Sequence, residues 1–149
     1  VIGWTIRIVD QGVKDVHVRS DPGAYDTDRD GLSDAAEYYD FFTNATDKDT
    51  DSDGLEDFTE AIDGFAWNGS KYYTNASSHD TDLDGLSDGE EVTDGLDQYI
   101  THANNPDSDD DGLFDGSEVL NIPRPWQGAT NPLNNDTDGD GQPDGWEMQ

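Results

Sequence analysis

Five copies of one acidic twelve-residue pattern run through this chain and restrict what it can fold into. They begin at residues 26, 49, 80, 107 and 136, are called loops 1 to 5, and read DTDRDGLSDAAE, DTDSDGLEDFTE, DTDLDGLSDGEE, DSDDDGLFDGSE and DTDGDGQPDGWE. Every copy has an acidic residue at positions 1, 3, 5, 9 and 12 and a glycine at position 6. Oxygen ligands at alternate positions, a glycine at a sharp turn and a final glutamate are the pattern of a calcium-binding loop. The five loops therefore predict about five bound Ca²⁺ ions.

The candidate ligands of each loop are its five acidic side chains and the backbone carbonyl group at position 7. They are Asp26, Asp28, Asp30, Leu32, Asp34 and Glu37; Asp49, Asp51, Asp53, Leu55, Asp57 and Glu60; Asp80, Asp82, Asp84, Leu86, Asp88 and Glu91; Asp107, Asp109, Asp111, Leu113, Asp115 and Glu118; and Asp136, Asp138, Asp140, Gln142, Asp144 and Glu147. A flexible site with many oxygen ligands suits calcium better than magnesium. The chain has no Cys and only three His, which disfavours zinc and copper.

The chain is strongly acidic, with 36 Asp and Glu against 7 Lys and Arg and a formal charge of −29. Such a composition is also found in disordered chains and in solvated acidic surfaces. However, 25 of the 36 acidic residues lie at the five ligand sets, so their positions are periodic rather than scattered. Five Ca²⁺ ions would leave a charge of −19. Nucleic acid is not expected as a partner, because no basic patch is available to bind phosphate.

Apolar residues are too few for one large core, since they make up 31% of the chain and lie between the loops. Two carboxylates about 5 Å apart repel by roughly 3 kcal/mol at an effective dielectric constant near 20. Closing a loop that gathers five of them should require a cation, so folding and calcium binding are predicted to be coupled. The expected fold is mostly irregular and calcium-stabilised, with a short helical turn after each loop, such as Asp34 to about Phe42.

A short signature precedes each loop and extends the repeat beyond twelve residues. It reads Ser20-Asp21-Pro22, Thr43-Asn44-Ala45, Thr74-Asn75-Ala76, Thr101-His102-Ala103 and Thr130-Asn131-Pro132. These residues favour an extended segment with a turn that leads into the loop. Paired EF-hands are disfavoured, because Pro22 and Pro132 stand where a helix would enter the loop. Spacers of different length between constant loops are typical of a repeat array.

The full motif, [S/T]-[D/N]-[P/A]-x-x-x-D-x-D-x-D-G-L-x-D-x-x-E, resembles the thrombospondin type 3 repeat of prokaryotic surface and secreted proteins. The resemblance covers residues 20–147, and we assign five such repeats to residues 20–149. It implies an elongated, calcium-loaded array that serves as a stalk, spacer or adhesive segment, with the 25 acidic residues as ligands. The Cys pairs of eukaryotic members are absent here, and the spacers are long. Whether each loop holds one ion or shares a second with its neighbour is left open, with Asp21 and Asp110 as candidate additional ligands.

Residues 1–19 form a different segment, which is predicted to be a β-hairpin or β-strand. Ile2, Trp4, Ile6 and Ile8 alternate with other residues before a turn at residues 10–12, and Val16 and Val18 alternate after it. An isolated hairpin is barely stable in water, so its apolar face needs a partner. The segment could pack on the first repeat, complete an upstream domain, or pair with another copy of the chain and form a fibre.

Several features favour a location outside the cell or on its surface. N-glycosylation sequons occur at Asn44, Asn68, Asn75 and Asn135, and Asn68 is the best candidate because it lies in an insert rather than in a repeated turn. Calcium loops of this kind also suit the millimolar calcium outside cells. No apolar stretch is long enough to span a membrane, and the chain starts at Val1 without a signal peptide, as expected of a processed piece.

Catalysis is not expected. The segment from Gly85 to Gly89 matches the G-x-S-x-G nucleophile motif, but Ser87 is at position 8 of a calcium loop. The leading prediction is an extracellular calcium-binding structural module, a stalk, spacer or subunit of a surface fibre. An alternative is an accessory or carbohydrate-binding module of a secreted enzyme, with Trp126 and Trp146 as candidate sugar platforms. A calcium-responsive regulator is disfavoured, because Met148 is the only Met and a Met-rich groove is not available.

Overall fold

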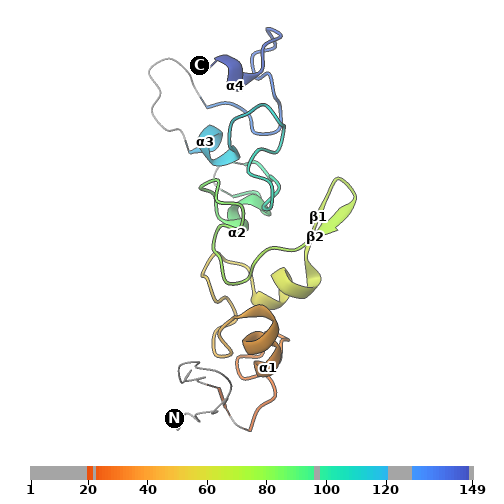
Figure 1. Ribbon diagram of the computed structural model, residues 1–149, viewed down its shortest axis with the longest axis vertical. Helices are drawn as coiled ribbons and strands as arrows, with labels where there is room; N and C mark the ends of the chain where they lie inside the picture. The colour runs from red at the N-terminus through yellow and green to blue at the C-terminus, as the bar shows by residue number, and fades with distance from the viewer. Residues whose placement is uncertain (1–19, 22, 96–97, 121–128, 148–149) are drawn as a thin grey trace, which may run out of the picture.

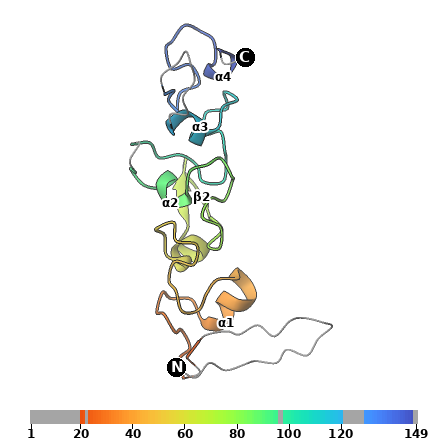
Figure 2. The same ribbon diagram turned by 90° about the vertical axis from the view of Figure 1, so that its left-hand side faces the viewer.

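The loops are stacked one after another along an elongated molecule (Figures 1 and 2). The computed structural model describes residues 20–147 apart from 22, 96–97 and 121–128. Within these residues the chain passes from loop 1 at one end to loop 5 at the other without folding back over earlier loops (Figure 1). The predicted β segment at residues 1–19, Trp126 and Met148 lie outside the described residues.

Most of the described backbone is irregular, and the helices are short. They are α1 (Asp34–Ala36), which continues into η1 (Glu37–Phe41), η2 (Thr59–Asp63), α2 (Asp88–Glu91), α3 (Asp115–Val119) and α4 (Asp144–Glu147). In loops 1, 3, 4 and 5 the helix begins at the acidic residue of position 9, and in loop 2 helical residues 57–58 lead into η2. The predicted helical turn after each loop is therefore confirmed, and η1 ends close to the expected position. That η1 and η2 are π-helical was not predicted.

One antiparallel hairpin lies between loops 2 and 3 and was not predicted. Its strands are β1 (Phe65–Trp67) and β2 (Ser70–Tyr72), with Phe65 opposite Tyr72. The connecting residues Asn68 and Gly69 have φ values of 48° and 82°. An Asn-Gly pair with positive φ at both residues is the favoured two-residue hairpin turn. The hairpin extends sideways from the stack (Figure 1).

The interior of the described region contains carboxylates as well as small apolar groups. The buried apolar side chains are Leu32, Ala45, Ala76, Leu86, Ala103 and Leu113. The largest fully buried side chains are instead four glutamates, Glu37, Glu60, Glu91 and Glu118. An ionised carboxylate is costly to bury unless it is paired with a cation or fully hydrogen-bonded. The fold therefore places its acidic residues where an apolar core would ordinarily lie.

Candidate metal centres

Each loop is closed by hydrogen bonds from its own backbone to its aspartates. In loop 2, Asp49 accepts from the backbone N–H of Ser52 at 2.8 Å and from that of Gly54 at 3.1 Å. Asp53 accepts from the N–H of Leu55 at 2.8 Å. Gly54 has a φ of 101°, a conformation that a residue with a side chain rarely adopts. The aspartates at positions 1 and 5 thus fold the loop around themselves, and the glycine at position 6 makes the turn possible.

The aspartates at positions 1, 3 and 5 form the first acidic cluster of a loop. In loops 1, 2 and 3 they bring one carboxylate oxygen each to within 4.8 Å of the others: Asp26, Asp28 and Asp30; Asp49, Asp51 and Asp53; and Asp80, Asp82 and Asp84. At position 3, one oxygen accepts the N–H of position 5, as in the 3.3 Å bond from Asp53 to Asp51. The other oxygen is buried without a hydrogen-bond partner in four loops, at Asp28, Asp51, Asp82 and Asp109. An unpartnered buried oxygen in an acidic cluster fits a metal ligand, because a bound cation would satisfy it.

The glutamate at position 12 is buried in loops 1 to 4. Glu37, Glu60 and Glu91 are fully buried, and Glu118 is 2% exposed. Each has at least one buried oxygen without a partner, and Glu37 and Glu118 have two. Burial and the neighbouring aspartates raise the pKa of Glu37 to about 8 and that of Glu91 to about 9. Without a cation, these side chains would therefore hold protons at neutral pH.

A second type of acidic cluster lies between neighbouring loops. Asp53 and Glu60 of loop 2 lie with Asp88 of loop 3, one oxygen of each within 4.8 Å of the others. Asp84, Glu91 and Asp115 form the equivalent cluster between loops 3 and 4. In both cases, the acid at position 9 joins positions 5 and 12 of the preceding loop. The predicted ligands of one loop are thus divided between two clusters, one inside the loop and one at its junction with the neighbouring repeat.

The carboxylate at position 9 is oriented by the residue at position 2 of its own loop. Thr81 donates its N–H to Asp88 at 2.8 Å and its hydroxyl to the other oxygen at 2.6 Å. The backbone bond recurs in all five loops, from Thr27, Thr50, Thr81, Ser108 and Thr137. The position-2 hydroxyl also accepts an N–H from the preceding signature, as in the 3.0 Å bond from Asn75 to Thr81. This role of position 2 was missed, although a hydroxyl residue recurs there in every copy.

The signature threonines were also missed as functional residues. Thr74 donates its hydroxyl to Glu60 at 2.9 Å, and Thr101 donates to Glu91 at 3.0 Å. Each threonine therefore orients the buried glutamate of the loop before it. The signature is more than a turn, because it donates hydrogen bonds to the glutamate of the preceding loop and to the position-2 hydroxyl of the following one.

A glycine at position 10 permits close approach between loops 2 and 3, 3 and 4, and 4 and 5. The N–H of Gly116 donates to Asp84 at 2.7 Å, and Gly89 and Gly145 donate to Asp53 and Asp111 at 3.1 Å. A Cβ on Gly116 would lie 2.5 Å from the backbone oxygen of Asp84. Position 10 therefore accepts only glycine at these junctions without a shift of the backbone.

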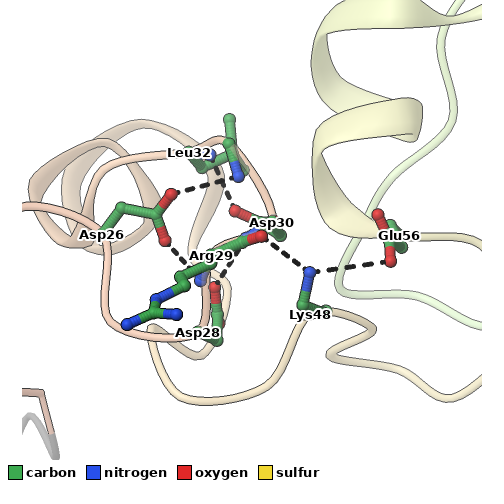
Figure 3. Close-up of polar contacts among 8 residues, drawn as sticks. Asp26, Asp28, Arg29, Asp30, Leu32, Lys48 and Glu56 are labelled. Atoms are coloured by element: carbon green, nitrogen blue, oxygen red, sulfur yellow. Dashed lines mark hydrogen bonds and ion pairs between the residues drawn. The ribbon is translucent and has the colours of Figure 1, made fainter.

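The junction between loops 1 and 2 is built differently. Position 10 of loop 2 is Phe58, whose ring packs against Gly31 so closely that a Cβ there would lie 2.9 Å from it. Lys48 spans the same junction, donating from Nζ to the carbonyl oxygen of Arg29 at 2.7 Å and lying 3.8 Å from Glu56 (Figure 3). Acids of the two loops also interact here, since the charge of Asp57 is among the causes that raise the pKa of Glu37.

Loop 5 is less enclosed than the other loops, and the residues at positions 7 and 8 contact their own loop. Glu147 and Gln142 of loop 5 are exposed, whereas Asp144 is buried. The position-7 leucines donate their N–H to the position-5 aspartate, as in the 2.7 Å bond from Leu86 to Asp84. Ser87 caps α2 by accepting the N–H of Glu90 at 3.1 Å, which gives this serine a structural role.

These residues fit a hard divalent cation that takes many oxygen ligands. The clusters contain only carboxylates, and in loops 1 to 4 they include buried oxygens that no protein donor reaches. Calcium takes six to eight oxygens in flexible geometry, which suits acids contributed by two successive repeats. Five acids of like charge per loop would otherwise repel one another.

Comparisons with known proteins give no assignment. No family model, no curated protein and no solved structure matches the chain. The resemblance to thrombospondin type 3 repeats therefore rests on the repeated motif alone. Among the described residues, no helix combines the length and the apolar character needed to cross a bilayer.

Proposed function

We propose that this chain is a calcium-binding structural module in which bound ions join successive repeats into a stiff, extended rod. One observation carries the proposal. Buried, unpartnered carboxylate oxygens recur at positions 3 and 12 of loops 1 to 4, in a stack of loops that has little apolar core. Such oxygens are costly in the folded state unless a cation binds them.

The clusters at the junctions explain how ions would stiffen the stack. An ion bound by Asp84, Glu91 and Asp115 touches loops 3 and 4 together, so it resists bending between them. The ion inside a loop fixes only that loop. We infer that the rod is an extracellular stalk or spacer, or a subunit of a surface fibre or adhesin, as the resemblance implies. Pairing of residues 1–19 with another copy would extend it into a fibre.

The number of ions is a direct test of this reading. Two types of cluster supply more than one position for an ion per loop, so the five loops should retain at least about five Ca²⁺ ions. Native mass spectrometry of the full chain in calcium counts them. Retention of no ions, or replacement of calcium by equimolar Mg²⁺, would contradict the proposal.

A matched pair of variants locates the ions. Asp82→Asn removes a carboxylate with a buried, unpartnered oxygen in loop 3. Asp63→Asn removes the same charge at an exposed residue outside the loops. The first variant should retain fewer ions than the unmodified chain, and the second should retain the same number. Equal loss in both would mean that calcium is held only by the overall negative charge.

The second candidate is an accessory module of a secreted enzyme that binds carbohydrate. It is favoured by Trp146 in α4, which is 71% exposed and could stack on a sugar ring. Glycan-array binding by the calcium-loaded chain, abolished in Trp146→Ala, would support this candidate. If the calcium-loaded chain binds no glycan, this second candidate is rejected and the structural role is favoured.

A further inference from the structure

The tip of the β1–β2 hairpin presents one sequon differently from the other three in the described residues. Asn68, Gly69 and Ser70 are all exposed. Among the described residues, neither the amide of Asn68 nor the hydroxyl of Ser70 has a hydrogen-bond partner. Both groups that define an N-x-S sequon are therefore free in the folded protein.

The base of the hairpin is fixed to a later repeat, which keeps the tip extended. The ring of Tyr72 stacks on His102 with centroids 4.2 Å apart, and Trp67 meets the same imidazole edge-on at 5.8 Å. Asn104 donates its side-chain amide to the carbonyl oxygen of Tyr73 at 2.8 Å. These contacts leave residues 68–70 as the free end of a supported arm (Figure 1).

The other three sequons are part of the turns that lead into calcium loops. The side-chain oxygen of Asn44 accepts the hydroxyl of its own sequon residue Thr46 at 3.0 Å. That of Asn75 accepts the hydroxyl of Ser77 at 3.0 Å. At Asn135 the sequon hydroxyl is that of Thr137, which accepts the N–H of Asn131 at 2.9 Å. In all three, the hydroxyl that an oligosaccharide transferase must read already has a hydrogen-bond partner, in the turn before the loop for Thr46 and Ser77 and in the loop itself for Thr137.

We propose that Asn68 is the preferred acceptor of an N-linked oligosaccharide on this chain. Its Nδ2 would form a C–N bond to the anomeric carbon of a lipid-linked oligosaccharide. The bond from that carbon to the lipid phosphate would break, and one amide proton would be released. The proposal rests on the extracellular placement in the proposed function. A glycan at the hairpin tip would project from the side of the rod, away from the acidic clusters.

The test is peptide mapping by mass spectrometry of the full chain, secreted from eukaryotic cells with a glycosylated reporter as a positive control. Enzymatic release of the sugar in ¹⁸O-labelled water marks each occupied Asn and separates it from spontaneous deamidation of the Asn68-Gly69 pair. Asn68 should be the most occupied of the four sequons. An unmodified Asn68 beside a glycosylated reporter, or equal occupancy of all four, overturns the proposal.

Two serine variants separate the hairpin from the turns. Ser70→Ala removes the hydroxyl of the Asn68 sequon and should abolish most of the glycan mass. Ser77→Ala removes the equivalent hydroxyl of the Asn75 sequon and should leave that mass almost unchanged. If Ser70→Ala retains the full glycan mass, the proposal is wrong. Calcium retention by the same secreted protein is measured separately, so loss of the glycan with calcium retained refutes only this inference.

Discussion

Successive loops are packed together by different contacts at two junctions, the one between loops 3 and 4 and the one between loops 1 and 2. At the first, the backbone of Gly116 approaches Asp84 directly and donates a hydrogen bond of 2.7 Å. At the second, the Phe58 ring lies between the loops and packs against Gly31. Acids of the two loops nevertheless interact at both junctions, since Asp115 lies with Glu91 in one and the charge of Asp57 raises the pKa of Glu37 in the other.

The two junctions share their acidic residues but differ in the packing around them. The packing residue at position 10 changes from glycine to phenylalanine, whereas the acids at positions 5, 9 and 12 remain at both junctions. The acidic clusters are therefore the common element of the stack, and the contact beside them is adjustable. Perturbing the acids should affect both junctions, and perturbing position 10 should affect each one differently.

The largest effect is expected from removing a buried glutamate. Glu91→Gln replaces a buried carboxyl group, the proposed ligand, by a neutral group of the same shape, and should lower calcium affinity at the junction of loops 3 and 4 by about 100-fold. Without calcium the same variant should be no less stable than the unmodified chain, because it removes a carboxyl group that must take up a proton to stay buried at neutral pH. Calorimetric titration and thermal unfolding with and without calcium measure the two effects. A loss of stability without calcium would mean that Glu91 has another partner.

A smaller effect is expected from closing the space at position 10. Gly116→Ala places a Cβ 2.5 Å from the Asp84 carbonyl oxygen and should destabilise the calcium-loaded chain by about 1–3 kcal/mol. The control is Ala35→Gly, since Ala35 is position 10 of loop 1 and is exposed. It should cost no more than about 1 kcal/mol. Thermal unfolding in saturating calcium compares them, and equal costs would contradict the close junction.

Protons should compete with calcium at both junctions. A buried glutamate with a raised pKa binds more protons in the calcium-free fold than in the unfolded chain. That fold is therefore favoured below the ordinary pKa of 4.5 and loses stability as pH rises toward about 8 at Glu37 and about 9 at Glu91. Calcium must displace these protons, so its affinity should increase with pH over the same range. Titrations in buffers of different ionisation enthalpy measure the proton release, and binding without release would contradict the prediction.

The smallest effect is expected at the surface of the first junction. Lys48 and Glu56 have side chains that are 43% and 55% exposed and lie 3.8 Å apart, so their ion pair is screened by water. Lys48→Met keeps most of the aliphatic chain and should change the free energy of unfolding by about 0–1 kcal/mol. Thermal unfolding checks this value. A larger loss would show that the Nζ bond to the carbonyl oxygen of Arg29 is needed to hold loops 1 and 2 together.

The sequence predicted the interior of each loop better than the contacts between loops. Alternate aspartates and the position-6 glycine predicted the loops and the helical turns, because these depend on residues a few positions apart. Spacing alone could not show that Asp88 lies with Asp53 and Glu60, since that contact depends on how two repeats stack. The sequence shows a glycine at position 10 of loops 3, 4 and 5, but it does not show why. These glycines do not have the positive φ of a turn, and they are needed for close contact with the preceding loop. The β1–β2 hairpin has a recognisable Asn-Gly turn, but no strand was predicted in the insert that contains it.

The most direct test of the central claim is small-angle X-ray scattering of the full chain in calcium and after removal of calcium by EDTA. In calcium, the scattering should fit an elongated, rigid particle like that in Figure 1. In EDTA at neutral pH, the repelling carboxylates should open the loops, and the profile should become that of a flexible, expanded chain. An unchanged rod profile in excess EDTA would contradict the account, because it would show that the stack of loops holds together without ions.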